Sequence, residues 1–108
     1  MRALAITSTK RSEQLPNVPT VGESGYPNYE ATSWFGFSAP AGTPRAIVDK
    51  LNQEMNKVFA EKEVREILAK QGAEINPMTP EQFGTFISDE MKKWAAVSKA
   101  SNVTSDLR

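Results

Sequence analysis

The apolar run Ala3-Leu4-Ala5-Ile6 is the feature that most constrains the fold of this chain. Its residues do not alternate between polar and apolar, which predicts a strand covered on both faces, as in a parallel α/β sheet. Such a strand needs neighbours on both sides. The sequence offers two further candidates, the aromatic segment 30–39 and the short segment 73–75. Because an open sheet usually has more strands, we expect this chain to be part of a larger α/β protein.

Two amphipathic helices are predicted in the middle of the chain. Apolar residues recur at helical spacing over residues 44–59, where Thr43 is the expected N-cap and Pro44 the first helical residue. A second helix, roughly residues 62–71, should end at Gly72, because glycine favours the left-handed conformation that closes many helices.

A third helix has the clearest start signal of the sequence. Thr79-Pro80-Glu81-Gln82 combines an N-cap residue, a proline at the first helical position and the glutamine of a capping box. The helix should run to about Ser101, with Trp94 on its apolar stripe and therefore in the core. We divide the single fragment 1–108 into a first part with two strands and a long loop, a helical part and a tail: residues 1–39, 40–101 and 102–108.

A connection of about twenty residues, 8–29, separates the first two strand candidates. It is rich in proline and glycine and shows no sustained period. Thr20-Val21-Gly22-Glu23 has the form of a capping box, so one helical turn is expected there. Loops of this length are usually functional or disordered, or indicate that part of the fold is missing.

The composition excludes several classes of function. Lysine plus arginine and aspartate plus glutamate each number 13, with no basic stripe, which argues against a nucleic-acid partner. Histidine and cysteine are absent, which removes the commonest general base, the thiol nucleophile and most transition-metal sites. A Ser-Lys or two-carboxylate hydrolase stays formally open, but the acidic residues mostly occupy predicted exposed helix faces. We therefore expect a binding protein with no catalytic residues, no cofactor and no metal.

Five residues are candidates for ligand binding. Thr7 and Ser8 directly follow the first predicted strand, and ligands of open α/β sheets bind beyond the carboxyl ends of strands. Their hydroxyls could hold an anion, or they could simply cap a turn. Trp34, beside Thr32 and Ser33, could form a cleft wall that excludes water next to hydroxyl donors. The alternative is that this aromatic residue packs in the core.

A series of short segments runs in order along nearly the whole chain: Arg2-Ala3-Leu4-Ala5-Ile6-Thr7-Ser8, Arg11, Leu15-Pro16-Asn17-Val18-Pro19-Thr20, Gly25-Tyr26-Pro27, Tyr29-Glu30-Ala31-Thr32-Ser33-Trp34-Phe35-Gly36, Ala39-Pro40-Ala41-Gly42-Thr43-Pro44, Gln71-Gly72-Ala73-Glu74 and Thr79-Pro80-Glu81-Gln82-Phe83. In this order and spacing the segments resemble the solute receptors of tripartite tricarboxylate transporters, the Bug/TctC family. Each segment is weak evidence by itself, whereas the ordered set is strong.

The resemblance implies a type II periplasmic-binding-protein-like α/β fold, of which this chain is the C-terminal portion with two or three short strands and three or four helices. Such receptors are periplasmic, hold small carboxylates between two domains and deliver them to membrane permease subunits without catalysis. It also implies that the segment around residues 32–38 crosses between the domains, and that the helices from Pro44 onward pack toward the first domain. A signal peptide would lie upstream of Met1, since none is present in the sequence. The alternative function is a self-associating interaction module without ligand, in which a homo-oligomer covers the helix faces.

Overall fold

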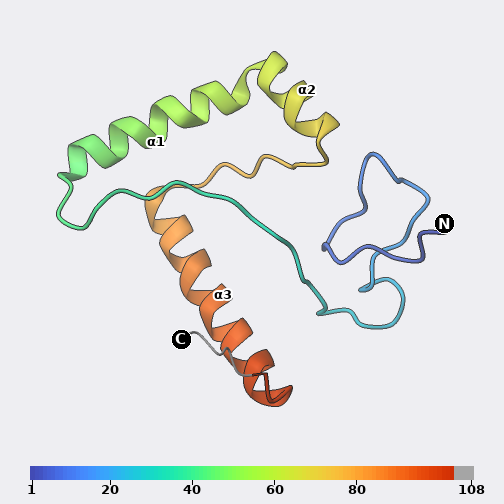
Figure 1. The fold of residues 1–108 in the computed structure, drawn as a ribbon. Coiled ribbons are helices and arrows are strands. Elements are labelled where there is room, and N and C mark those ends of the chain that lie inside the picture. The colour runs from blue at the N-terminus through green and yellow to red at the C-terminus, as the bar shows by residue number, and fades with distance from the viewer. Residues whose placement is uncertain (104–108) are drawn as a thin grey trace. The chain divides into compact units, whose positions relative to one another are not determined.

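The computed structural model describes residues 1–103 and contains three helices (Figure 1). They are α1 (Arg45–Ala60), α2 (Lys62–Lys70) and α3 (Pro80–Ala100). The three predicted helices are thus confirmed to within about one residue at each end. The predicted tail, residues 102–108, falls mostly outside the described residues.

The chain divides into two compact units. The first comprises Met1–Pro40 and Glu66–Glu74, and the second comprises Ala41–Arg65 and the residues from Ile75 onward. The first unit therefore carries all five candidate ligand residues, and the second carries α1 and α3.

Within the described residues, the predicted strands do not form β-ladders. The only pairing is an isolated parallel bridge between Ile6 and Thr20, in which Ile6 N donates to Pro19 O and Val21 N to Ile6 O, each over 2.9 Å. The strand predictions for residues 3–6, 30–39 and 73–75 are therefore wrong for this chain. Aromatic and branched residues favour extended backbone, but a strand forms only where a neighbouring segment pairs with it.

The first turn of α1 differs from the prediction. The N-cap is Pro44, with ψ of 138°, and its carbonyl accepts hydrogen bonds from the backbone N–H groups of Ile47 and Val48. Thr43 therefore lies one residue before the cap, and the prediction that Pro44 is the first helical residue is wrong by one position. The fixed φ of proline suits either position, and it is the extended ψ of Pro44 that places it outside the helix.

The two later helices have the predicted terminal motifs. The capping box of α3 is complete, because Thr79 Oγ1 accepts from Gln82 N (3.1 Å) and Thr79 N donates to Gln82 Oε1 (2.9 Å). The chain leaves α2 through Gly72, with φ of +76°. There Ala73 N donates to Leu68 O (3.0 Å) and Gly72 N to Ala69 O (2.9 Å), the two bonds of a Schellman motif.

The second unit is held together by contacts between α1 and α3 and by polar links between their neighbouring segments. Asn52 of α1 donates from Nδ2 to Met78 O over 2.9 Å, just before α3. Arg45, at the start of α1, forms ion pairs with Asp49 and with Glu81 of α3. These exposed ion pairs orient side chains more than they stabilise the fold.

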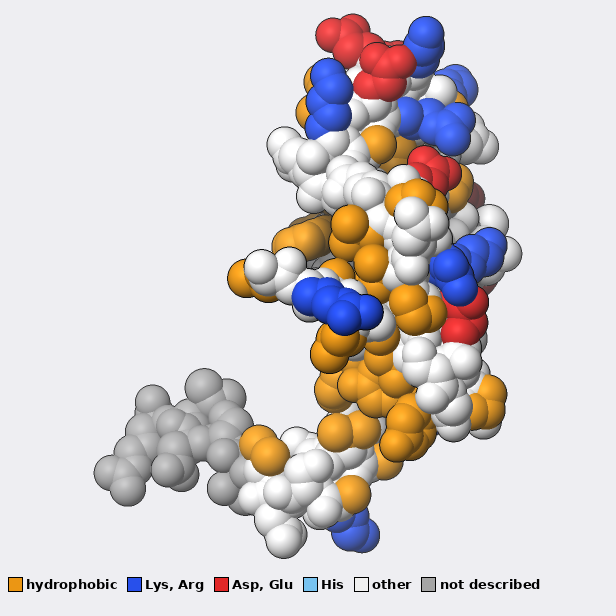
Figure 2. All heavy atoms as spheres, turned by 90° about the vertical axis from the view of Figure 1, so that its right-hand side faces the viewer, with side chains coloured by type: hydrophobic (Ala, Val, Ile, Leu, Met, Phe, Trp, Pro, Cys, Tyr) orange, Lys and Arg blue, Asp and Glu red, His pale blue; other side chains and the backbone are white. Residues whose placement is uncertain are grey.

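No hydrophobic residue is buried within residues 1–103, and many apolar side chains are visible on the face shown in Figure 2. The prediction that Trp94 belongs to the core is wrong: it is 44% exposed, and its indole N–H donates to Glu90 Oε2 over 2.8 Å. An apolar stripe on a helix becomes core only where another element covers it, and Trp94 is not covered in this way. Among the described helices, none has the length and apolar character needed to cross a membrane.

Candidate functional site

Four of the candidate residues carry hydroxyls and form two pairs along the chain, Thr7-Ser8 and Thr32-Ser33. The structure brings these two pairs onto neighbouring segments of the first unit. The backbone N–H of Ala31 donates to the carbonyl oxygen of Thr7 over 2.9 Å. Thr7 and Ser8 therefore lie beside the segment that continues into Thr32 and Ser33, although 24 positions separate Thr7 from Ala31 in the sequence. The two pairs lie far apart in the sequence, and this hydrogen bond joins their segments.

The five candidate residues differ in exposure. Thr7 and Ser33 are exposed, and Ser8 and Thr32 are half-buried. Trp34 is 41% exposed, so its ring is available as a wall beside Thr32 and Ser33. The Ser8 hydroxyl donates to Lys10 O over 2.7 Å, which is the turn-capping role considered above as its alternative.

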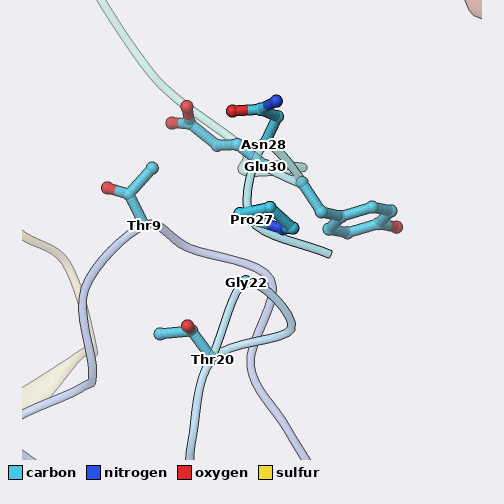
Figure 3. A pocket seen from close by; sticks show the side chains of 7 residues that line it. Thr9, Thr20, Gly22, Pro27, Asn28 and Glu30 are labelled. Atoms are coloured by element: carbon cyan, nitrogen blue, oxygen red, sulfur yellow. The ribbon is translucent and has the colours of Figure 1, made fainter. Parts of the chain in front are cut away.

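A hollow of about 280 Å³ lies next to these segments in the first unit (Figure 3). None of the five candidates lines it, but its wall includes the residue that follows Ser8 and the one that precedes Ala31. It is lined by Thr9, Thr20, Gly22, Pro27, Asn28, Tyr29 and Glu30. This hollow could not be predicted from the sequence, because residues from both ends of a loop without periodicity form it. The signal in the sequence was the set of hydroxyl and amide side chains within that loop, with the carboxylate of Glu30 directly after it.

Thr20 is the most enclosed residue of the hollow, with an exposed fraction of only 3%. Its backbone N–H donates to Glu23 Oε2 (2.9 Å), and its Oγ1 accepts from Glu23 N (3.1 Å). Its carbonyl accepts from the Ser24 hydroxyl over 2.9 Å. The predicted capping box is thus confirmed in its hydrogen bonds, whereas the predicted helical turn is wrong, since residues 21–25 form turns.

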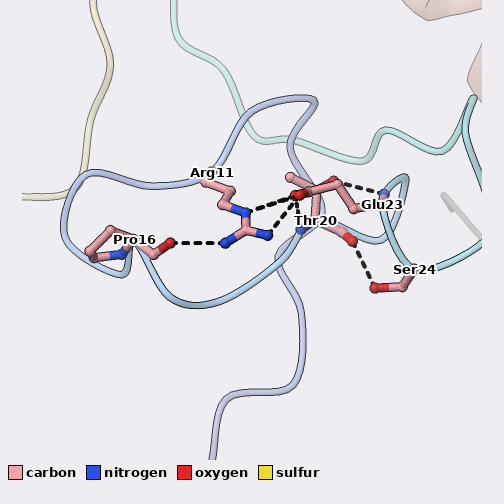
Figure 4. Close-up of polar contacts among 5 residues, drawn as sticks. All are labelled: Arg11, Pro16, Thr20, Glu23 and Ser24. Atoms are coloured by element: carbon pink, nitrogen blue, oxygen red, sulfur yellow. Dashed lines mark hydrogen bonds and ion pairs between the residues drawn. The ribbon is translucent and has the colours of Figure 1, made fainter.

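The carboxylate of Glu23 also pairs with Arg11 (Figure 4). Arg11 Nη2 lies 2.7 Å from Glu23 Oε1 and Nε lies 3.0 Å from Oε2, while Nη1 donates to Pro16 O over 3.1 Å. The hydrogen bond from Arg11, followed by that from the backbone N–H of Thr20, lowers the pKa of Glu23 to about 2. The same ion pair raises the pKa of Arg11. One carboxylate thus fixes two distant parts of the loop beside the hollow.

The chemistry of this site suits binding. Hydroxyl, amide and carboxylate groups line the hollow, and all of them recognise ligands through hydrogen bonds. Over residues 1–103, no group of three or more His, Cys, Asp or Glu residues is arranged to hold a metal ion.

Comparisons with known proteins identify the family. The family described as tripartite tricarboxylate transporter family receptor matches residues 1–103. Protein BugT of Bordetella pertussis is 45% identical over 97 residues, which are 90% of this chain and 30% of BugT. A protein encoded in the tcbD-tcbE intergenic region of a Pseudomonas species is 41% identical over 95 residues, 87% of this chain and 28% of that protein.

Solved structures agree with the sequence relatives. The R. palustris protein Rpa4515, solved with adipate, aligns with a TM-score of 0.79 and 34% identity over 94% of this chain. The periplasmic binding protein BugD aligns with a TM-score of 0.76 and 37% identity over 92% of this chain. This likeness confirms the predicted class, a portion of a periplasmic-binding-protein-like α/β fold.

The chain spans about a third of the length of these relatives, since the aligned part covers 30% of BugT and 34% of each solved structure. The match nevertheless extends over nearly every described residue, as the sequence resemblance predicted. This chain therefore belongs to the family of tripartite tricarboxylate transporter receptors, the Bug/TctC family.

Proposed function

We propose that this chain is the C-terminal portion of a periplasmic receptor that binds a small carboxylate and delivers it, unchanged, to membrane permease subunits. The observation that carries the proposal is the hydrogen bond from Ala31 N to Thr7 O, which sets two pairs of hydroxyl residues side by side. Family membership supports the receptor role. The adipate of Rpa4515 and the periplasmic description of BugD support the ligand class and the compartment.

The proposed contacts follow from what a carboxylate requires. Its oxygens accept several hydrogen bonds, and hydroxyl donors satisfy them without a paired cation. Thr7, Thr32 and Ser33 supply such donors, and Trp34 shields the site from water. Ser8 takes part after its hydroxyl rotates away from Lys10 O.

Isothermal titration with adipate, succinate and citrate tests the proposal. We expect one of these acids to bind, and Ser33→Ala to weaken that binding by about three- to tenfold, as expected for one lost hydrogen bond. Ser88→Ala, on an exposed position of α3, is the matched control and should leave the affinity unchanged. Equal affinities for the wild type and Ser33→Ala would remove Ser33 from the site, and a lack of binding by every acid would contradict the proposal.

A second function is favoured by one observation, the exposure of apolar side chains throughout residues 1–103. Ile47, Leu51, Met91 and Trp94 are each between 44% and 69% exposed, and large apolar surfaces of this kind often mark interaction sites. We propose that copies of this chain self-associate through the faces of α1 and α3. Light scattering over a range of concentrations tests this, and a monomer at high concentration with a sharp thermal transition would argue against it.

A further inference from the structure

Residues 33–39, here called the pairing segment, form an exposed stretch of the first unit without helix, strand or turn (Figure 1). Phe35 is 98% exposed and Phe37 is 73% exposed. Their backbone groups, like those of Gly36 and Ser38, form no backbone hydrogen bond within residues 1–103. A segment of this kind presents N–H and C=O groups that pair readily with another extended backbone.

The composition of the pairing segment suits a second copy of itself as that partner. No charged residue occurs from position 31 to position 44, so two copies meet there without repulsion between like charges. The pairing segment lacks proline and contains three aromatic residues and one glycine. Short uncharged segments with these properties are those that associate with identical segments.

A hydrogen bond just before the pairing segment indicates which edge is open. Ala31 N donates to Thr7 O over 2.9 Å, so Ala31 faces the edge where Thr7 lies. In extended backbone, the groups of every second residue face the same edge, and those of the residues between face the opposite edge. Gly36 and Ser38 therefore face away from Thr7, toward the edge on which no backbone hydrogen bond reaches them within residues 1–103.

We propose that two copies of this chain pair antiparallel through this edge, with Gly36 on the two-fold axis. The two Gly36 residues then exchange both of their backbone hydrogen bonds. Phe35 lies directly opposite Phe37 of the other copy, and the axis produces this aromatic pair twice. This register is the one that places both phenylalanines opposite an aromatic residue. Neither phenylalanine belongs to the candidate ligand residues, so the pairing does not depend on the carboxylate site.

The size of this contact predicts a weak dimer. Four aromatic side chains bury at most about 150–250 Å² each, and a two-stranded ribbon covers them incompletely. The buried area therefore stays below the roughly 1,200–2,000 Å² of stable complexes. The dimer should accordingly form only as the protein concentration is raised.

Sedimentation velocity of the 108-residue chain over a range of concentrations tests the proposal, with two charged double variants. Phe35→Lys combined with Phe37→Lys, and Phe35→Glu combined with Phe37→Glu, each place like charges opposite one another. Each should weaken dimerisation by about tenfold or more, the value of the two lost aromatic pairs before any repulsion. An equimolar mixture should restore the dimer, because lysine of one copy then lies opposite glutamate of the other.

The mixture also guards against a trivial loss of structure, since misfolded variants would not form a defined dimer when combined. Circular dichroism checks that each double variant keeps its helices, which the exposure of both phenylalanines leads us to expect. Met91→Lys, at a position of α3 that is 69% exposed, is the matched control. It should leave this dimer unchanged, which separates the pairing segment from the self-association proposed for α1 and α3.

The outcomes are distinct. A monomer at every concentration would overturn the pairing and the self-association of α1 and α3 together, and would leave the carboxylate receptor standing. A dimer that persists in both double variants and is lost in Met91→Lys would overturn the pairing in favour of the helix faces. A mixture that stays monomeric would overturn the antiparallel register. Loss in each double variant with recovery in the mixture supports the proposal.

Discussion

Arg11 and Glu23 form a two-point ion pair across the loop that precedes the candidate site, with Nη2–Oε1 and Nε–Oε2 distances of 2.7 and 3.0 Å. The same carboxylate accepts a hydrogen bond from the backbone N–H of Thr20, the most enclosed residue of the described chain. A segment without helix or strand is thereby given a defined conformation. Loops carry many binding residues, and a satisfied polar network of this kind makes a loop more rigid.

The first prediction concerns pH. The pKa of Glu23 falls from its ordinary value of 4.5 to about 2 on folding. The ion pair therefore stabilises the folded loop fully at pH values above 4.5. This contribution is lost as the pH decreases through about 2. Carboxyl-detected NMR should therefore place the midpoint of Glu23 near 2, and Arg11→Gln should move it upward. A midpoint of 4 or above in the wild type would show that the ion pair does not form in solution.

The second prediction concerns the end of α2. Gly72 has φ of +76°, a conformation that costs an L-residue about 1–2 kcal/mol. Gly72→Ala should therefore lower the free energy of unfolding by about 1 kcal/mol in urea denaturation. Gly84→Ala, within α3, should raise it by about 0.5–1 kcal/mol, because alanine favours the helix. A free energy of unfolding that is unchanged or raised in Gly72→Ala would contradict the Schellman motif at Gly72.

The third prediction concerns the start of α3. Thr79→Ala removes the hydroxyl that accepts from Gln82 N, and such N-cap losses cost about 1 kcal/mol. Thr85→Ala, at an exposed helical position, is the matched control and should be neutral or slightly stabilising. Urea denaturation followed by circular dichroism gives the free energy of unfolding of each variant and so distinguishes Thr79→Ala from Thr85→Ala. A control that destabilises as much as Thr79→Ala would show that the capping box contributes little.

The sequence predicted the helices well because their signals are local. The stripe of α1, the glycine after α2 and the capping box of α3 each act within a few residues, so neighbours along the chain decide the outcome. Only the cap of α1 was misplaced, where Thr43 and Pro44 both suit the position before the helix. The Thr20–Glu23 capping box was likewise recognisable from its residue types.

The strands and the burial of Trp94 could not be predicted from local signals, because both depend on partners elsewhere. Residues 30–39 have the composition of a strand, but the hydrogen bond from Ala31 to Thr7 does not extend into a β-ladder within residues 1–103. The hollow depends on a loop conformation set by Arg11 and Glu23, which are 12 positions apart. Among the five candidate residues, the proximity of Thr7 to the segment before Thr32 became visible only through the bond to Ala31. Their role in ligand binding stays a prediction.

Thermal unfolding with and without small carboxylates tests the central claim most directly. A ligand at 100 times its dissociation constant stabilises the folded state by about 2.7 kcal/mol, which raises the melting temperature measurably for a chain of this size. We predict an upward shift with at least one acid of the panel, reduced in Ser33→Ala and unchanged in Ser88→Ala. A cooperative transition that no carboxylate shifts would contradict the claim that this chain holds a carboxylate site.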